Sequence, residues 1–268
     1  MVAERIIEIL GATPVAADGN IASGVWVLDA EGDSDVVVAA GARATLAILD
    51  KDGARDINID VMAGAELRLL HVVTERSASQ IAVAVAEGGV CVTTEIVVAS
   101  SDTRVVASLV ERGAKFELGG AFVLTEEDKA SVTVDVNHLA EECVSRTSYK
   151  GVASGKAHGS FSGLVYVAPG AQRTDSVQSS RNITIGDARI ETLPQLEIYA
   201  DDVKCSHGAT VGLMDSDAIL YMRQRGLNLA MAKRLQIEGF VEDVVLHSSV
   251  EGVADILSEI VAEKLNRL

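Results

Sequence analysis

Between about residues 20 and 210 the chain alternates polar and apolar positions in short runs. Residues 56–61 (DINIDV), 131–137 (SVTVDVN) and 182–185 (NITI) follow a period of two. This period places one set of side chains on a buried face and the other in water. Turn signals such as Glu87-Gly88-Gly89 separate the runs. The pattern predicts a body built from many short strands.

A weak internal repeat runs through this body, in which a Gly-Ala pair opens a strand. It occurs at Gly41-Ala42, Gly64-Ala65, Gly113-Ala114 and Gly170-Ala171. Repeated strand–turn units without intervening helices predict a β-solenoid, in which each coil buries its inner face on its neighbours. A β-sandwich also has many short strands. Because aromatic residues make up only 3% of the chain, a narrow interior of Val, Ile, Leu and Ala favours the solenoid.

After residue 213 the pattern changes to helical spacing. A short helix is predicted from near Asp215 to Gly226, and Asn228 is a candidate cap for the helix that follows. A last segment carries an i, i+3, i+4 stripe, formed by Val253, Ile256, Leu257, Ile260 and Val261. These stripes either pack on the strand-rich body or leave a groove for a partner.

Charge and cysteine content narrow the functional classes. The formal net charge of −16 disfavours a phosphate-binding surface, so no nucleic-acid partner is expected. No run approaches the roughly 18 apolar residues of a membrane span, and the N-terminus lacks the layout of a signal peptide. Three scattered cysteines do not form a disulfide framework. We therefore expect a cytoplasmic protein.

Three stretches resemble the SufB/SufD family of iron–sulfur cluster assembly proteins. They are PQLEIYADDVKCSHGATVG (residues 194–212), the segment 145–182, and LYMRQRGLNLAMAKRLQIEGFVEDVV (residues 220–245). The resemblance implies a mainly β protein with a right-handed parallel β-helix core and a C-terminal α-helical domain. The expected division is an N-terminal segment over 1–19, the β-helix core over 20–212 and the helical domain over 213–268.

The same resemblance implies a scaffold role. Two core subunits would pair through their β-helices, as a homodimer or as a heterodimer with a second SufB/SufD-type subunit. The C-terminal helices would dock SufC, an ABC-type ATPase. Candidate docking residues are Met222, Arg223, Arg225, Leu235 and Phe240. The chain has no GxxxxGK[ST] phosphate loop, so it is expected to bind no nucleotide and to be no enzyme itself.

Cys205 and His207 are the candidate metal ligands. Iron–sulfur clusters bind thiolate and accept imidazole, and residues i and i+2 of a strand point to the same side. One chain supplies only two ligands where about four are usual, so a two-fold interface would supply the rest of a transient, shared cluster. Cys143, within the matching region, is a weaker candidate. Alternatively, Cys205 is a small buried residue and His207 a surface histidine.

Two departures from the family bear on its type. SufB-type scaffolds carry a cysteine near the position of Ser180 here, and they have HEAT where this chain has HGAT at residues 207–210. Both favour a SufD-like chain, while the short length of 268 residues also fits a single-type chain of a minimal system. The competing functions are a metal-free structural interaction module and a β-helix polysaccharide lyase or hydrolase. The single tryptophan argues against the second, because sugar-binding grooves use aromatic platforms.

Overall fold

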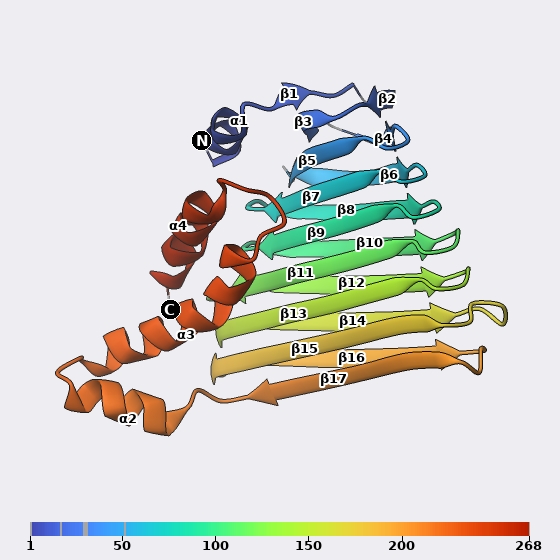
Figure 1. Ribbon diagram of the computed structural model, residues 1–268. Coiled ribbons are helices and arrows are strands. Elements are labelled where there is room, and N and C mark those ends of the chain that lie inside the picture. The colour runs from blue at the N-terminus through green and yellow to red at the C-terminus, as the bar shows by residue number, and fades with distance from the viewer. Residues whose placement is uncertain (1, 17, 29–31, 51, 268) are drawn as a thin grey trace.

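The strands wind into a two-sheeted parallel β-helix with helices along one flank (Figure 1). The computed structural model describes residues 2–16, 18–28, 32–50 and 52–267. Odd-numbered strands form one sheet in the order β1-β3-β5-β7-β9-β11-β13-β15-β17, and even-numbered strands form the other from β2 to β16. All pairings are parallel, and neighbours in a sheet are two strands apart in sequence. The expected β-helix is therefore confirmed, and the β-sandwich is excluded.

The elements of the nine-stranded sheet are β1 (Thr13–Pro14), β3 (Gly24–Leu28), β5 (Arg43–Asp50), β7 (Glu66–Val73), β9 (Val90–Val97), β11 (Lys115–Leu124), β13 (Val144–Gly155), β15 (Thr174–Gly186) and β17 (Val203–Gly212). Those of the eight-stranded sheet are β2 (Asp18–Ile21), β4 (Ser34–Val38), β6 (Gly53–Val61), β8 (Ser77–Val85), β10 (Ser101–Leu109), β12 (Lys129–His138), β14 (His158–Val167) and β16 (Arg189–Ile198). The helices are α1 (Val2–Leu10), α2 (Ser216–Gln224), α3 (Leu229–Leu246) and α4 (Ala254–Leu265).

The glycine repeat marks the turns that lead into the odd strands. Gly41, Gly64, Gly88 and Gly113 have φ between +61° and +73°, a region that favours glycine. Each donates its N–H to a carbonyl of the next turn, as Gly41 does to Ala63 at 3.0 Å. Gly170 was wrongly placed in this series, because the left-handed position in that coil belongs to Arg173 at φ 59°. Gly88 belongs to the same series of turns but was not included in the Gly-Ala repeat, because glycine, not alanine, follows it.

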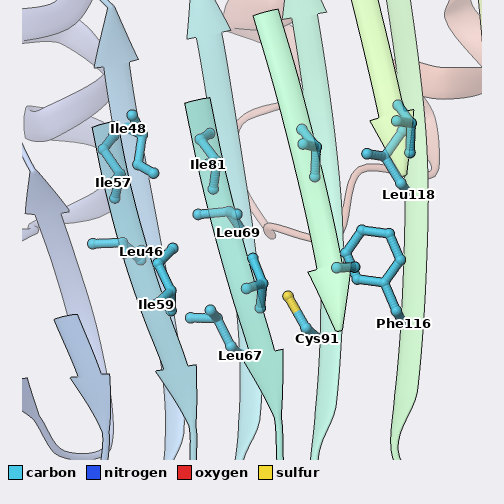
Figure 2. Packing of buried hydrophobic residues seen from close by; sticks show 14 of the residues in the cluster. Leu46, Ile48, Ile57, Ile59, Leu67, Leu69, Ile81, Cys91, Phe116 and Leu118 are labelled. Atoms are coloured by element: carbon cyan, nitrogen blue, oxygen red, sulfur yellow. The ribbon is translucent and has the colours of Figure 1, made fainter. Parts of the chain in front are cut away.

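Branched aliphatic side chains fill the space between the two sheets (Figure 2). Leu46 aligns with Leu69 in one sheet, and Ile57 aligns with Ile81 in the other. All four are fully buried. Because parallel strands in register place equivalent residues side by side, each coil adds one layer to the same apolar column.

The helices cover the outer face of the nine-stranded sheet. Apolar residues of both layers join in one cluster, which includes Ala47, Leu49, Leu70, Val72, Ile96, Ala121, Val123 and Val152 of the sheet and Ile237, Val241, Val244, Ile256, Leu257 and Ile260 of the helices. Of the two expectations for the helical stripes, packing on the body therefore holds for α4 and for the second half of α3. By contrast, α2 has no buried residue and projects beyond this contact (Figure 1).

A buried lysine fixes α3 to the sheet. The Lys150 Nζ donates to the Phe240 carbonyl at 2.8 Å and to Asp243 Oδ2 at 2.7 Å. The same ammonium lies 5.1 Å from the centre of the Phe240 ring. Lys150 is buried, so these partners replace the water that the ammonium loses.

One chain of charged and polar groups crosses the interior of the middle coils. The Arg55 Nε donates to Asp50 Oδ1 at 2.9 Å, and His71 lies between two carboxylates, 2.9 Å from Asp50 Oδ2 and 2.9 Å from Glu95 Oε1. The Tyr149 hydroxyl donates to Glu95 Oε2 at 2.7 Å. Opposite charges alternate along this chain, so the burial of each is compensated by its neighbours.

The surroundings of this chain set its protonation. Burial opposes the charged imidazole, but the Asp50 carboxylate and the hydrogen bonds to Asp50 and Glu95 outweigh it and raise the pKa of His71 to about 9. Burial and the neighbouring Glu95 charge raise the pKa of Tyr149 well above its usual value. The chain therefore carries a protonated histidine at neutral pH.

Candidate metal site at the open end of the β-helix

The β-helix is open at its C-terminal end. In the described part of the chain β17 pairs only with β15, and β16 pairs only with β14. We call the interior face of β16 and β17 the open end. Parallel edges of this kind present unpaired backbone groups to a further strand.

Cys205 and His207 lie on β17 and point toward the interior side. In register, Cys205 aligns with Ser176 and His207 aligns with Gln178. Both of these β15 residues are buried between the sheets. Because residues two apart on a strand share a side, the thiol and the imidazole both face the open end.

The two candidate ligands differ in exposure. Cys205 is partly buried and packs with Val165, Val167 and Leu196. Burial raises the pKa of its thiol, and the nearby Asp175 charge adds to the shift. His207 is exposed and makes no hydrogen bond or ion pair with the residues that the structure describes. The imidazole is thus free to bind a metal, while the thiol is protonated until a metal displaces its proton.

The coil beneath these ligands has a polar interior. Its inward-facing side chains on β15 are Ser176, Gln178, Ser180 and Asn182. The equivalent positions of β7 begin with Leu67 and Leu69. The Asn182 Nδ2 donates to the Ser180 Oγ at 3.0 Å. The β15 side of the coil beneath the open end therefore offers hydrogen-bonding groups, which suit a polar or charged guest better than an apolar one.

The ligand set of one chain is incomplete. Among the described residues no group of three or more His, Cys, Asp or Glu side chains is placed to hold a metal ion. Asp201 and Asp202 precede the pair but are exposed in a turn, where the Asp202 carbonyl accepts a hydrogen bond from the Arg173 N–H. A tetrahedral site needs about four ligands, so Cys205 and His207 could supply at most half of one.

Comparison with known proteins identifies the family. The model for the "SUF system FeS cluster assembly, SufBD core domain" matches residues 17–240. The chain belongs to the SufBD family. It is 42% identical to the iron–sulfur cluster assembly protein SufD of Escherichia coli (strain K12) over 119 residues, which is 44% of this chain and 28% of that protein. The identity is 30% over 140 residues to SufD of Bacillus subtilis (strain 168), covering 52% of this chain and 32% of that protein.

A third relative points the same way. A SufBD family iron–sulfur cluster assembly protein of Synechocystis is 39% identical over 114 residues, covering 42% of this chain and 25% of the relative. The chain thus matches less than a third of the length of each of these three relatives. Within the described residues, no helix is both long enough and apolar enough to cross a membrane.

The other two cysteines of this SufBD-family chain lie away from the open end. Cys91 is fully buried, and burial raises the pKa of its thiol to about 12. Cys143 is also buried, at a turn, where its Sγ donates to the Glu111 carbonyl at 3.3 Å. The structure does not bring Cys143 together with Cys205 and His207. Ser180, near which the family resemblance places the cysteine of SufB-type chains, lies in the interior of the β-helix. It aligns with Ala209 of β17.

The expected docking residues fall into two groups. Met222, Arg223, Arg225 and Leu235 lie on α2, its cap and the first half of α3. Asp215 and Asn228 cap these two helices, as expected. Phe240 differs, because its ring and carbonyl hold Lys150 and its side chain packs on the sheet cluster. Phe240 therefore serves the contact between α3 and the β-helix.

A cleft of about 1400 Å³ lies between α1, α4 and the turns that follow the odd strands. It is lined by charged side chains, among which Lys264 and Asp128 form an ion pair at 2.6 Å. None of the candidate ligands or docking residues lines it. Since its charges are mixed and it has no pair of soft ligands, the open end is the better candidate for iron–sulfur chemistry.

Proposed function

We propose that this chain is a non-catalytic scaffold subunit on which an iron–sulfur cluster is assembled in the cytoplasm. The observation that carries the proposal is the half-site at the open end, where Cys205 and His207 share one side of an edge strand. The cluster is cargo, held transiently during assembly. Family membership supports involvement in SUF-type assembly.

Pairing with a second SufB/SufD-type subunit would complete the site. A two-fold axis at the open end would place a second ligand pair opposite the first, giving about four ligands. Exposed apolar side chains on the interior side of both edge strands support such an interface, since Val211 is 46% and Ile198 38% exposed. The second subunit would be another copy of this chain or a SufB-type chain with its own cysteine.

The projecting helices are the proposed ATPase-docking surface. Tyr221 is 58%, Leu229 45% and Leu235 42% exposed on α2 and on the first half of α3. Met222 borders these residues, and Arg223 and Arg225 supply the charged rim that protein interfaces commonly have. A SufC-like ABC ATPase is the partner that the family resemblance implies. Phe240 is left out of this surface because it is engaged within the chain.

The first test is to measure iron and acid-labile sulfide per protomer after anaerobic reconstitution. We expect stoichiometric binding in the wild type and loss in Cys205→Ser/His207→Ala. The matched control is His158→Ala, an exposed histidine on β14, which should bind as the wild type does. Equal binding by the double variant would contradict the proposed ligands. No binding by the wild type alone but binding after mixing with a SufB-type chain would assign it the accessory role.

A second test separates the two proposed interfaces. Leu229→Asp should weaken ATPase binding and leave pairing unchanged, while Val211→Asp should weaken pairing and leave ATPase binding unchanged. Both positions are exposed, so neither variant should disturb folding. Deletion of the helical region would be a poor test, because it uncovers the apolar sheet face under α3 and α4. Unchanged ATPase binding in Leu229→Asp would refute the docking surface.

A further inference from the structure

One side chain in the coil beneath the open end is buried without a partner. Gln178 is 1% exposed, and neither Nε2 nor Oε1 has a hydrogen-bond partner in the part of the chain that the structure describes. Burying an unpaired amide destabilises a fold, because the group loses its hydrogen bonds to water. Gln178 therefore carries a cost that nothing within the described residues offsets.

The fold makes room for this amide. Gln178 extends from β15 across the interior to Gly163 of β14, where a Cβ atom would lie 1.9 Å from the Gln178 Nε2. Glycine at 163 thus leaves the space that the amide occupies. Two further buried atoms in the same coils, Asn182 Oδ1 and Thr192 Oγ1, also have no partner among the described residues.

The position of Gln178 relates it to the candidate ligands. It is the residue that aligns with His207, and its neighbour in the interior column, Ser176, aligns with Cys205. The backbone of Gln178 therefore lies one strand spacing, about 4.8 Å, beneath that of His207. The amide rests against Gly163, so to reach sulfur at the open end the side chain must turn about its own bonds toward β17.

We propose that Gln178 is a positioning residue of the open end, whose side-chain N–H groups hydrogen-bond to sulfur held by Cys205 and His207. The inference rests on the proposed function, since the acceptor is a cluster sulfide or the metal-bound Cys205 thiolate. An amide offers two donors, and hydrogen bonds to cluster sulfur stabilise the more negative, reduced state. Neighbouring hydrogen-bond donors are one of the means by which a protein sets a cluster's potential.

The decisive experiment compares Gln178→Leu with the wild type, both reconstituted with iron and sulfide as full chains. We expect the variant to bind the cluster with its reduced form about tenfold less favoured, which lowers the potential by about 59 mV for one electron. The matched control is Gln80→Leu, an exposed glutamine on β8, which should leave the potential unchanged.

Gly163→Ala provides an independent second variant. The added methyl group occupies the place of the Gln178 amide and pushes it aside without removing it. The potential should therefore shift again, while Co²⁺ added to the metal-free protein should still give a thiolate charge-transfer band that depends on Cys205. Metal-free Gln178→Leu should unfold at the same or a higher temperature, because the unpaired amide is gone.

Each outcome bears on a different claim. An unchanged potential in both Gln178→Leu and Gly163→Ala, with the cluster bound, overturns the role of Gln178 and leaves the proposed ligands standing. Loss of stability in metal-free Gln178→Leu with an unchanged potential shows that the amide serves the fold through ordered water. Absence of any Cys205-dependent cluster or Co²⁺ band in the wild type, alone and with its partner chain, overturns the site and the role of Gln178 with it.

Discussion

The interior of this β-helix treats polar side chains in two different ways. In the middle coils, Asp50, His71, Glu95 and Tyr149 form a chain in which every charge faces an opposite charge or a hydrogen bond. At the open end, Gln178 is equally buried but has no partner among the described residues. Buried polar groups that serve only the fold are normally paired.

The two regions therefore suggest different roles for the same kind of residue. The members of the paired chain find all these partners within one protomer, so the chain can specify how the coils stack. The unpaired amide belongs to Gln178 of β15, the strand that pairs with the edge strand carrying Cys205 and His207. Single buried atoms of Ser79, Thr103 and His138 in the middle coils also lack a partner among the described residues, but in Gln178 both polar atoms of the amide do. The proposed role of Gln178 supplies that partner from outside the chain.

The largest expected effect comes from breaking the paired chain. His71→Leu removes the cation between two buried carboxylates and should lower the free energy of unfolding by about 3–5 kcal/mol. Chemical denaturation of both proteins at neutral pH measures it. Gln178→Leu, near the open end of the interior, is the control and should not lower the free energy of unfolding. A loss below about 1 kcal/mol in His71→Leu would show that the chain is not a stabilising ion network.

The same chain should make stability depend on pH. The folded-state pKa of His71, about 9, lies above its ordinary value of 6.5. Its contribution is thus complete below about pH 6.5 and is lost as the pH rises through 9, by about 3 kcal/mol in total. Burial would raise the pKa of Asp50, but His71 and Arg55 outweigh it and lower that pKa, so its contribution is lost in acid. Denaturation from pH 6 to 10 should show the alkaline loss in the wild type and not in His71→Leu.

A smaller effect is expected at the far end of the paired chain. Tyr149→Phe leaves Glu95 Oε2 without its donor and should lower the unfolding free energy by about 1–3 kcal/mol. Tyr166→Phe, a half-buried tyrosine whose ring lies 5.7 Å from that of Tyr199, is the control and should change stability by less than about 0.5 kcal/mol. Equal effects of the two variants would remove the case for a specific hydrogen bond.

The smallest effect is expected from the candidate thiol. Cys91 and Cys205 occupy the same interior column, joined through Phe116, Ser145 and Ser176. Cys91→Ser buries an added hydroxyl in the apolar middle and should cost about 1–3 kcal/mol. Cys205→Ser, at the open end, should stay within about 0.5 kcal/mol. Thermal unfolding of both variants would test whether the open end is built for binding instead of packing.

Much of the fold could be predicted from the sequence because strands and helix ends depend on patterns of neighbouring residues. Alternation predicted the strands, Asp215 and Asn228 predicted the helix starts, and Gly226 ends α2 at φ 97°. The placement of Cys205 and His207 on the same side of β17 followed from their spacing of two residues on a strand. The helix α1 was not predicted, and the expected N-terminal segment includes residues 1 and 17, which lie outside the described residues.

The sequence also contained a signal, not used in the predictions, for which sheet the helices cover. In β5 the residues from Leu46 to Asp50 are all buried, whereas β8 and β10 alternate along their whole length. The continuous burial in the odd strands arises because the helices cover their outer face. Unbroken apolar runs at one end of alternate strands would have indicated which sheet the helices cover.

The sequence by itself determined the strand period, the turns and the helix ends, because these depend on residues close together in the chain. Only the tertiary structure decided which residues meet across coils. Tyr149 reaches Glu95 because Gly120, between them in the stack, leaves room for its ring. Gln178 likewise depends on Gly163 in the opposite sheet. Such contacts join residues from different coils, and the stacking register sets them, so no local pattern encodes them.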